Sequence, residues 1–567
     1  MADPSPRFPI PSLSRTPVHL AILLTLAGLV LLLGLGDLGL TDRDEGSNAE
    51  AAREMLETGD WISPTLNYEP RYAKPAFVYW LISGTYALFG IHEFAARLPG
   101  ALFGIGLILL QYFFLARLLG TRVAFFGALM LLLNVEFVAT CRMVLTDPEL
   151  VFFTTLSSYS FWLGLRGEGR DRQFFWLFYL GMALAMLTKG PVGIVIPLLA
   201  VIPYLTLTRQ WGKFWRRGFP MAGLVVFLLV AAPWYLAMFA IHGADYAAAA
   251  QANTMGRFAN PMEGHGGTVL FYFPILFLGF FPWSGFLPFA LYESLKNWRA
   301  YRSGVLSPSG ENGLALFTGL WVLGVFIFFS LSATRLPHYL FPLFPAASIL
   351  TAMVWSRFVH EPSPAGLRPS LATIVILGYL LGLALASLPT VYEAFIDKIA
   401  LEFPAALKVG PGLTPIIAGA TVLMGVMVIR YLGLTENYRA SAFWVAGGMT
   451  LTVLLILILL ALPRFNKYFI APPQELAEIA GLNLGPDDRL IQFGRKQPSL
   501  MFYAKRKIFQ INPGEDQKFQ PHLDPSHRTM IILQSRLRSR LPSPVSEFPV
   551  VLQRYGFSLL SSESLLR

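Results

Sequence analysis

The sequence predicts a polytopic α-helical membrane protein with a small soluble α/β domain at its C-terminus. Of its 567 residues, 54% are apolar and only 14% are charged, whereas soluble proteins average about 25% charged residues. Apolar runs of membrane-helix length recur up to residue 462. After that point the apolar runs stop, and short strand-like segments replace them.

Thirteen apolar runs approach the length of a membrane helix, which is about 17 to 25 residues. They lie at 18–36, 98–118, 122–140, 147–166, 173–188, 190–208, 219–241, 268–293, 314–332, 338–356, 370–389, 413–433 and 441–462. We expect the first run to be a retained helix, because its flank has little positive charge and no small-residue cleavage site.

Basic loops favour the cytoplasmic side of a membrane, and this preference sets the predicted topology. The clearest basic loops are 117–122, 166–172, 209–217 and 296–302. All four lie inside only if the short aromatic segment 76–90 does not cross, so we predict an interfacial helix there, anchored by Tyr79, Trp80 and Tyr86. The segment 45–57 has apolar residues at helical spacing, and we expect it to lie flat on the outer surface.

Five polar stretches begin or end apolar runs, and the predicted topology places all of them on the outer side. They are Thr41–Gly46, Arg71–Pro75, Thr146–Pro148, Lys189–Pro191 and Arg335–Tyr339. Each one alone could be an ordinary polar loop between membrane helices. Together they predict one outer site that contains both acidic and basic groups.

The predicted organisation has two parts. Residues 1–462 form the membrane domain with outer loops at 41–97 and 242–267, and residues 463–567 form the soluble domain, with strands expected at 490–493, 530–533 and 550–553. Glycines around His265 indicate a flexible or tightly turned loop, either a mobile lid or a plain linker. The soluble domain contains no catalytic motif that we recognise, so a structural or partner-binding role is expected for it.

Charge and cysteine content exclude several classes of protein. The net charge of +10 comes from Lys and Arg dispersed over short loops, whereas a nucleic-acid-binding protein concentrates them on one face. We therefore expect no nucleic-acid partner. The single cysteine, Cys141, excludes an internal disulfide and a Cys-rich zinc site, so any metal here must use histidine and carboxylate.

Carboxylates at the outer ends of helices are the candidate catalytic groups. Asp44, with Glu45 beside it, and Asp147 lie far apart in the sequence, yet helices of one bundle can bring such ends together. Paired carboxylates suit transfer of a sugar, because one can hydrogen-bond the substrate while positive charge develops at the anomeric carbon. The alternative is that Asp147 caps a helix, since Asp followed by Pro is a strong helix start signal.

Cationic residues in these stretches are candidates for binding a phosphate. Lys74, Lys189, Arg257 and Arg335 have no acidic neighbour in sequence, and Arg71, Tyr72 and Tyr339 accompany them. Ordinary solvated charge is the alternative. His265 and His338, with a carboxylate such as Glu45 or Glu263, would make a chemically reasonable zinc site, whereas loop histidines that bind no metal are the simpler interpretation.

The order of these motifs resembles the lipid-dependent glycosyltransferases of the GT-C fold, in the branch of protein O-mannosyltransferases and bacterial aminoarabinose transferases. The resemblance covers about residues 40 to 345. It is carried by Asp44-Glu45, Lys74-Pro75, Phe94–Pro99, Thr146-Asp147-Pro148, Lys189-Gly190-Pro191, Arg257-Phe258 with Asn260 and His265, Pro282-Trp283, and the proline-spaced Arg335–Pro345. Similar proteins often have Glu where this chain has Ala73, so another carboxylate must serve any role of that Glu.

The resemblance implies a bacterial inner-membrane enzyme whose active site faces the periplasm. Its donor would be undecaprenyl phosphate carrying 4-amino-4-deoxy-L-arabinose, its acceptor a phosphate of lipid A, and no nucleotide would take part. A phosphate acceptor is already an anion near neutral pH, so Asp44 would stabilise positive charge rather than act as a base. Alternatives are another acceptor, as in protein O-mannosyltransferases, a lipid-linked sugar transporter, or a scaffold protein. Transporters usually carry ionisable groups at the bilayer midplane, where Glu136 is the main exception in this chain.

Overall fold

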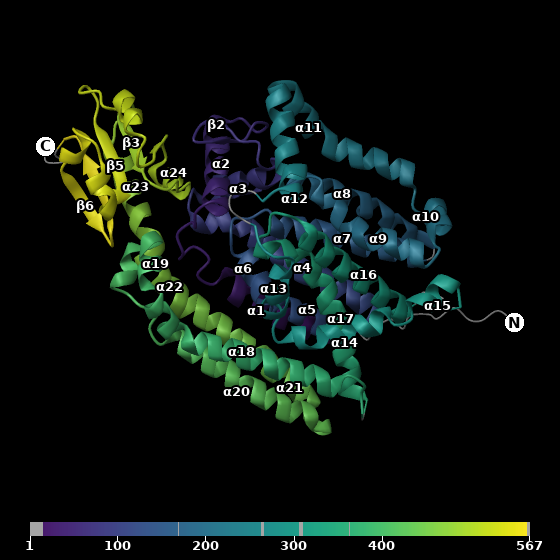
Figure 1. The fold of residues 1–567 in the computed structure, drawn as a ribbon. Coiled ribbons are helices and arrows are strands. Elements are labelled where there is room, and N and C mark those ends of the chain that lie inside the picture. The colour runs from purple at the N-terminus through teal and green to yellow at the C-terminus, as the bar shows by residue number, and fades with distance from the viewer. Residues whose placement is uncertain (1–14, 168, 262–265, 306–309, 362, 564–567) are drawn as a thin grey trace.

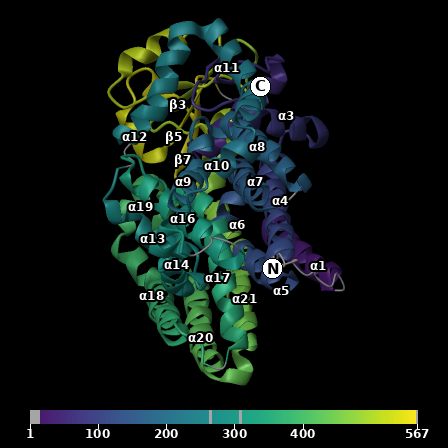
Figure 2. The same cartoon turned by 90° about the vertical axis from the view of Figure 1, so that its right-hand side faces the viewer.

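The structure is a computed structural model that describes residues 15–167, 169–261, 266–305, 310–361 and 363–563. A body of helices carries a five-stranded sheet at one end (Figure 1). The view turned by 90° places that sheet at the same end as α3 and part of α11 (Figure 2). The predicted fold class, a polytopic helical membrane protein with a small C-terminal α/β domain, is confirmed.

Helices follow the predicted apolar runs closely. The first half of the membrane domain contains α1 (Thr16–Ala27), η2 (Gly28–Leu32), α2 (Asp44–Thr58), α3 (Phe77–Phe89), α4 (Glu93–Leu119), α5 (Thr121–Leu132), α6 (Val135–Cys141), α7 (Asp147–Arg166), η3 (Gly169–Gln173), α8 (Phe174–Lys189), α9 (Val192–Leu207) and α10 (Trp211–Arg217). The second half contains α11 (Pro220–Gln251), η4 (Ala252–Gly256), α12 (Arg257–Ala259), η5 (Val269–Phe271), α13 (Tyr272–Gly279), η6 (Trp283–Phe286), α14 (Leu287–Leu295), α15 (Trp298–Ser303), α16 (Gly310–Leu331), η7 (Pro337–Leu343), α17 (Phe344–His360), α18 (Leu367–Ala394), α19 (Ile396–Glu402), η8 (Pro404–Leu407), α20 (Thr414–Leu434), η9 (Glu436–Tyr438), α21 (Arg439–Ile456) and η10 (Leu457–Ala461).

Bends interrupt some of the predicted spans. Among the described residues, seven helices are long and apolar enough to cross a bilayer alone, and up to ten candidates result if each bent helix pair is one span. The predicted run 122–140 bends by 64° between α5 and α6, where the Asn134 side chain accepts a hydrogen bond from the Phe137 amide and starts the second helix. The run 268–293 breaks before Pro282, which has no amide hydrogen to donate. Thirteen crossings and the interfacial position of α3 stay predictions.

Helix α2 forms where the 45–57 pattern predicts a helix, but it does not lie on an exposed surface. Its residues from Glu45 to Met55 are buried, because α3 covers one side and α24 (Ser499–Ala504) of the C-terminal domain covers another. Gly46 permits this contact, since a Cβ there would lie 2.6 Å from the Ser499 amide nitrogen. Its position flat on the outer membrane surface stays a prediction, but α2 is not exposed to solvent and is an internal element between two domains.

The predicted outer loop 242–267 is largely helical. Helix α11 extends to Gln251 with one break at Gly243, whose φ of 50° and ψ of −122° lie outside the helical region. The alanine run 247–250 favours a helix after that break, and η4 and α12 continue it. Residues 262–265, which include His265 and Glu263, lie outside the described residues, so the expected flexible turn there is not tested.

The C-terminal domain contains a mixed sheet of order β4-β3-β5-β7-β6. Helical turns α22 (Leu462–Phe465) and η11 (Asn466–Ile470) lead into α23 (Ala471–Asn483), and the strands are β3 (Arg489–Phe493), β4 (Phe509–Ile511), β5 (Thr529–Gln534), β6 (Val550–Arg554) and β7 (Phe557–Ser561), with η12 (Asp516–His522), η13 (Ser535–Arg540) and η14 (Val545–Glu547) between strands. Strands β4, β3 and β5 are parallel, whereas β7 and β6 pair antiparallel. The three predicted strands are confirmed.

Hydrogen bonds fasten the C-terminal domain to the segment before α2. The Asp42 carboxylate accepts hydrogen bonds from the Ser499 amide and from the Gln497 side chain, both at 3.0 Å. The Tyr503 hydroxyl accepts from the Leu40 amide at 2.9 Å and donates to Glu93 at 2.8 Å. A hairpin of β1 (Thr65–Leu66) and β2 (Glu69–Pro70) lies between α2 and α3. The loop that carries Asp44 is thus held from both domains.

Candidate active site

The predicted outer motifs converge on one narrow space at the ends of several helices. Asp44 and Asp147 are the first residues of α2 and α7, and Lys189 is the last residue of α8. The helix macrodipole favours acids at helix N-termini and bases at C-termini, so these positions suit the charges. The space is lined by Asp44, Asn48, Lys74, Leu145, Thr146, Asp147, Lys189, Arg257, Leu336, His338 and Tyr339.

Asp147 and Lys189 form a buried ion pair at the centre of this space. The Lys189 ammonium donates to both Asp147 oxygens, at 2.7 and 2.8 Å. His338 Nε2 lies 3.9 Å from the same carboxylate, and the Lys189 nitrogen lies 5.0 Å from the ring centre of Tyr339. Asp147 makes no cap to its own helix, since Thr146 occupies the cap position without a side-chain hydrogen bond. The carboxylate therefore orients cations from the first turn of α7, without capping that helix.

Asp44 differs from Asp147 because its carboxylate has no hydrogen-bond partner among the described residues. Burial by itself would raise the pKa of Asp44, but the positive charges of Lys74, His338 and Lys189 outweigh burial and lower it. Asp44 is therefore an anion at neutral pH, and its oxygens are available to a substrate.

Lys74 is the most perturbed cation of the site. Burial, together with the neighbouring charge of Lys189, lowers the pKa of Lys74 to about 7, although Asp44 opposes the change. Arg257 lies on the other side of the space, where its guanidinium donates to the Tyr339 hydroxyl at 3.4 Å. Three cationic side chains from distant segments thus face one space, as the sequence predicts.

A largely apolar cavity of about 620 Å³ adjoins the charged space and shares Lys74, Asp147, Lys189 and Arg257 with it. Its apolar wall comes from α9, α11, α16 and the η4–α12 turn. The wall contains Val192, Val195, Tyr235, Phe239, Tyr246, Met255, Phe258, Phe328 and Phe329. Tyr72 also lines the cavity, with its hydroxyl 3.2 Å from His242 Nδ1. A cavity with one charged end and one apolar end suits a phosphate attached to a hydrocarbon chain.

Glu45 does not belong to this space, which corrects its predicted catalytic and metal-binding roles. Its carboxylate is fully buried and accepts hydrogen bonds from Arg97 at 2.7 Å and from the Thr41 amide at 2.8 Å. It also accepts from the Val144 amide at 3.1 Å. Both oxygens are therefore engaged, and Glu45 fixes the backbone on either side of Asp44 and Asp147.

Two predicted phosphate ligands make hydrogen bonds within the protein. The Arg335 guanidinium donates to the Gly267 and Ser330 carbonyl oxygens and lines neither the charged space nor the cavity beside it. Arg71 donates to the Tyr79 hydroxyl at 3.1 Å and to the Asn48 side chain at 3.3 Å. Both arginines contact the loops around the site, and their roles as direct substrate ligands stay predictions.

The predicted zinc site is only partly within the described chain. His338 lines the charged space, while His265 and Glu263 lie outside the described residues. Glu45 cannot serve as the third ligand because Arg97 and two amides occupy its oxygens. The described segments contain no group of three or more His, Cys, Asp or Glu side chains arranged for a metal. Zinc bound through the two histidines stays a prediction.

Sequence reasoning missed Asn48 and the aromatic wall of the cavity. Asn48 lies one helical turn after Asp44, so the helical spacing of this segment could have placed both side chains on one face. The Asn48 side-chain amide donates a hydrogen bond to the Val144 carbonyl oxygen at 3.0 Å. Tyr235, Tyr246 and Phe329 come from separate helices of a chain in which 14% of residues are aromatic. No local signal distinguishes these three from aromatic residues that only pack in a membrane.

Comparisons with known proteins identify relatives of this chain. Residues 44–247 match the family model described as dolichyl-phosphate-mannose-protein mannosyltransferase. An undecaprenyl phosphate-alpha-4-amino-4-deoxy-L-arabinose arabinosyl transferase 2 from Pseudomonas fluorescens is 30% identical, over 78% of this chain and 76% of that protein. The corresponding transferase from Edwardsiella ictaluri is 31% identical, over 74% and 72%. The crystal structure of ArnT from Cupriavidus metallidurans bound to undecaprenyl phosphate has a TM-score of 0.76 at 23% identity, covering 98% of this chain and 99% of that one.

Proposed function

The chain belongs to the family of undecaprenyl phosphate-aminoarabinose arabinosyl transferases, and from this membership we propose that it moves 4-amino-4-deoxy-L-arabinose from undecaprenyl phosphate to a phosphate of lipid A. It is a multi-pass membrane protein and a lipid-dependent glycosyltransferase. The reaction takes place on the periplasmic side of a bacterial inner membrane. Lipid A as acceptor and the periplasmic site are parts of this proposal.

The proposed reaction exchanges one phosphate for another at the anomeric carbon of the sugar. An oxygen of the acceptor phosphate forms the new bond to that carbon, and the bond between the carbon and the donor phosphate oxygen breaks. The electron pair of the broken bond stays with undecaprenyl phosphate, which changes from a singly charged diester to a monoester with one more negative charge. The site must therefore stabilise positive charge at the sugar and growing negative charge on the leaving phosphate.

The residues of the charged space match these two demands. Asp44 is ionised and has no competing hydrogen bond, so it can face the positive charge that develops at the anomeric carbon. Lys74, Lys189 and Arg257 surround the junction with the apolar cavity, where the phosphate of a lipid bound in that cavity would lie. Lys189 keeps one ammonium hydrogen free of Asp147 and can donate it to that phosphate.

The observation that carries this proposal is the junction of an apolar cavity with three cations and an unpaired carboxylate. A soluble nucleotide sugar would not need the apolar wall of nine large side chains. A protein acceptor would need a base, since a hydroxyl must lose a proton in order to attack. Asp44 is a poor base because its pKa is lowered. An acceptor that is already an anion needs no base, so it is compatible with a carboxylate that binds protons weakly.

The test is a transfer assay with purified protein. Incubation with the undecaprenyl-phosphate aminosugar and lipid A should add the mass of one aminosugar residue to lipid A. The Asp44→Asn variant should lose about 100-fold or more of the rate, as is typical when a charge-stabilising group is removed. Asp245→Asn, a matched change at an exposed carboxylate of α11, should keep the wild-type rate. Failure of the wild-type protein to modify lipid A would refute the acceptor, and full activity of Asp44→Asn would refute the role of Asp44.

A further inference from the structure

A second large cavity lies between the membrane domain and the C-terminal domain. Its volume is about 680 Å³. Four segments border it: residues 40–43 ahead of α2, helix α19, the turn η11 and the chain that follows the parallel strands. We call it the interdomain cavity. None of its lining residues lines the largely apolar cavity of the active site, where the donor lipid is proposed to bind.

The topology of the sheet makes this position a natural binding site. Strand β3 lies between β4 and β5 in the sheet. The chain passes from β3 to β4 on one side and then from β4 across to β5 on the other side, so the direction of the connections reverses beside β3. Ligands of open parallel sheets bind outside the carboxyl ends of the strands at such a reversal. Residues 492–497, 512–513 and 532–537, which line the cavity, occupy the carboxyl ends of β3, β4 and β5.

The charged side chains that line the interdomain cavity are mostly basic. Five basic side chains and two carboxylates line it: Arg43, Lys398, Arg495, Lys496, Arg536, Asp42 and Glu402. The Asp42 oxygens accept hydrogen bonds from Gln497 and Ser499 of the C-terminal domain. Glu402 pairs with Arg495 at 2.5 Å. In the described part of the chain Lys496 has no ion-pair partner, so an excess of positive charge faces the cavity.

The lining also has an apolar part, which lies beside the ends of long apolar helices. Phe403, Phe465 and Phe469 form an aromatic cluster with ring centres 5.3 to 5.9 Å apart. Phe403 directly follows α19, shortly after the apolar helix α18, and the other two phenylalanines extend the continuous helical run 436–483. An aromatic wall next to apolar helices would contact the chains of a lipid, whereas a soluble anion would make no use of it.

We propose that the interdomain cavity binds the phosphate-bearing head group of a second lipid, separate from the donor lipid. The basic residues hold the phosphate, and the phenylalanine cluster holds the start of the lipid chains. Two sources share this chemistry: the lipid A acceptor, which rests on the function proposed above, and a bulk anionic phospholipid. Because residues 40–43 border the cavity and Asp44 follows them, a lipid in it lies directly beside the loop that carries the catalytic carboxylate.

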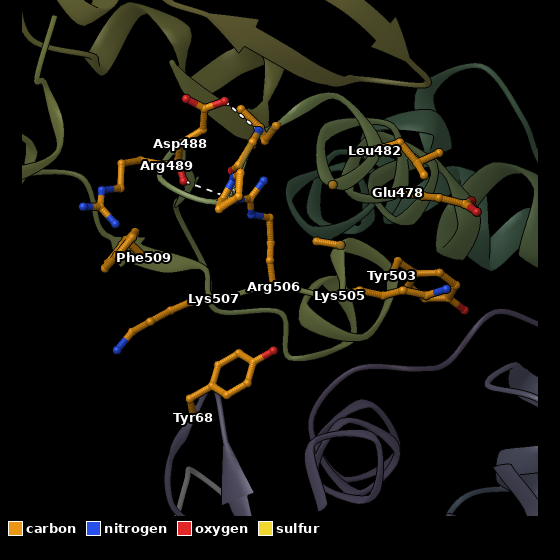
Figure 3. A pocket seen from close by; sticks show the side chains of 15 residues that line it. Tyr68, Glu478, Leu482, Asp488, Arg489, Tyr503, Lys505, Arg506, Lys507 and Phe509 are labelled. Carbon is orange, nitrogen blue, oxygen red and sulfur yellow. Dashed lines mark hydrogen bonds between the residues drawn. The ribbon is translucent and has the colours of Figure 1, made fainter. Parts of the chain in front are cut away.

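A different basic cleft in the C-terminal domain provides a matched control. It lies between the β1–β2 turn, α23 and α24 and contains Arg489, Lys505, Arg506 and Lys507 (Figure 3). Arg506 donates to the carbonyl oxygens of Gly485 and Asp488, and Lys507 lies 3.4 Å from Glu69. This cleft has similar charge but no aromatic wall from the membrane helices, so it should not hold a lipid.

The experiment measures lipid binding without transfer. Wild-type protein in phosphatidylcholine nanodiscs is titrated with lipid A in one arm and with phosphatidylglycerol in the other, and undecaprenyl phosphate is titrated in a parallel sample. Lys398→Glu combined with Lys496→Glu should weaken binding of at least one of the two probe lipids tenfold or more and leave the undecaprenyl phosphate affinity unchanged. Lys505→Glu combined with Lys507→Glu should change none of the affinities.

Wild-type affinity of the Lys398→Glu, Lys496→Glu protein for both probe lipids would overturn the proposal. An equal loss in the control protein would overturn it as well, because it would show non-specific attraction. A photoreactive lipid should label peptides containing Phe403 or Phe469 in the wild-type protein, and labelling confined to other regions would also refute the site. Undecaprenyl phosphate that fails to bind the wild-type protein would refute the donor assignment instead, so the two failures are distinguishable.

Discussion

Lys74 allows the sharpest test of the donor site, because its charge should depend on pH in the range where the enzyme can be assayed. Burial and the charge of Lys189 lower the pKa of Lys74 from 10.5 to about 7. At 1.36 kcal/mol per pKa unit, the free site disfavours this ammonium by about 5 kcal/mol relative to water. A bound phosphate supplies the missing negative charge, so donor binding should restore the proton.

The sign of the pH effect follows from proton linkage. Above pH 7 the free protein has lost the Lys74 proton while the donor complex keeps it, so binding takes up a proton and weakens as pH rises. Below pH 7 both states carry the proton, and the affinity should be flat. Between pH 6 and pH 8.5 the protonated fraction of the free lysine falls about 30-fold, which sets the largest expected loss of affinity. Asp44 stays ionised throughout, since its pKa is lowered.

The assay is equilibrium binding, at pH 6 and pH 8.5, of a non-reactive phosphodiester analogue of the donor whose sugar has no amino group, because an amine would itself titrate in this range. A diester has no second ionisation, whereas undecaprenyl phosphate itself would titrate with a pKa of about 6. Lys74→Ala should bind the donor about 1.5 to 3 kcal/mol more weakly at pH 6, the value of a hydrogen bond to a charged group, and should lose the pH dependence. Lys74→Arg should keep the charge at both pH values and also show no pH dependence. A Lys74→Ala protein with wild-type affinity and an unchanged pH slope would refute the reasoning.

Three other predictions concern the buried charges and the topology. Asp147→Asn and Lys189→Ala should be strongly non-additive in donor affinity, because the two side chains form one ion pair; additive losses in the double variant would contradict this. Arg97→Met should lower the free energy of unfolding by about 3 to 5 kcal/mol, since it leaves the Glu45 charge buried and unpaired. Arg117→Met, which removes an exposed ion pair with Asp171, should lower the free energy of unfolding by only about 0 to 1 kcal/mol. Equal melting temperatures for the Arg97 and Arg117 variants would contradict a stabilising role for the buried pair. In a Cys141→Ala background, a cysteine at the exposed position Asp60 should react with an impermeant thiol reagent from outside and one at Gly212 should not; labelling at Gly212 in intact cells would overturn the topology.

The elements that the sequence predicts well depend on information within each segment. Long apolar runs predict the helices, because every backbone polar group in a bilayer must be satisfied within its own segment. Charges that cannot enter hydrocarbon must stay at helix ends. For this reason Asp44, Lys74, Asp147 and Lys189 could be assigned to one face before any fold was known, and the structure brings them together.

The features that the sequence does not predict depend on partners from distant parts of the chain. Helix α2 has the pattern of a surface helix, but its second cover comes from α24, more than 400 residues later. Glu45 and Asp44 are adjacent in sequence, yet the first turns to Arg97 and the second to the charged space. Two adjacent positions on one helix therefore point to different surroundings, and this decides which carboxylate is structural and which faces the site. The sequence does not show that Arg97 packs against Glu45.

The charges of the site match the charges of the proposed reaction. With Lys74 neutral, the two carboxylates Asp44 and Asp147 balance Lys189 and Arg257, so the free site has little net charge to solvate in a partly apolar environment. Protonation of Lys74 adds one positive charge, which equals the single negative charge of a phosphodiester donor. When the sugar leaves, its phosphate gains a second negative charge beside three cations, while the acceptor phosphate loses one. A lysine with a pKa of about 7 can take up a proton from solvent when the donor binds and release it when the product departs.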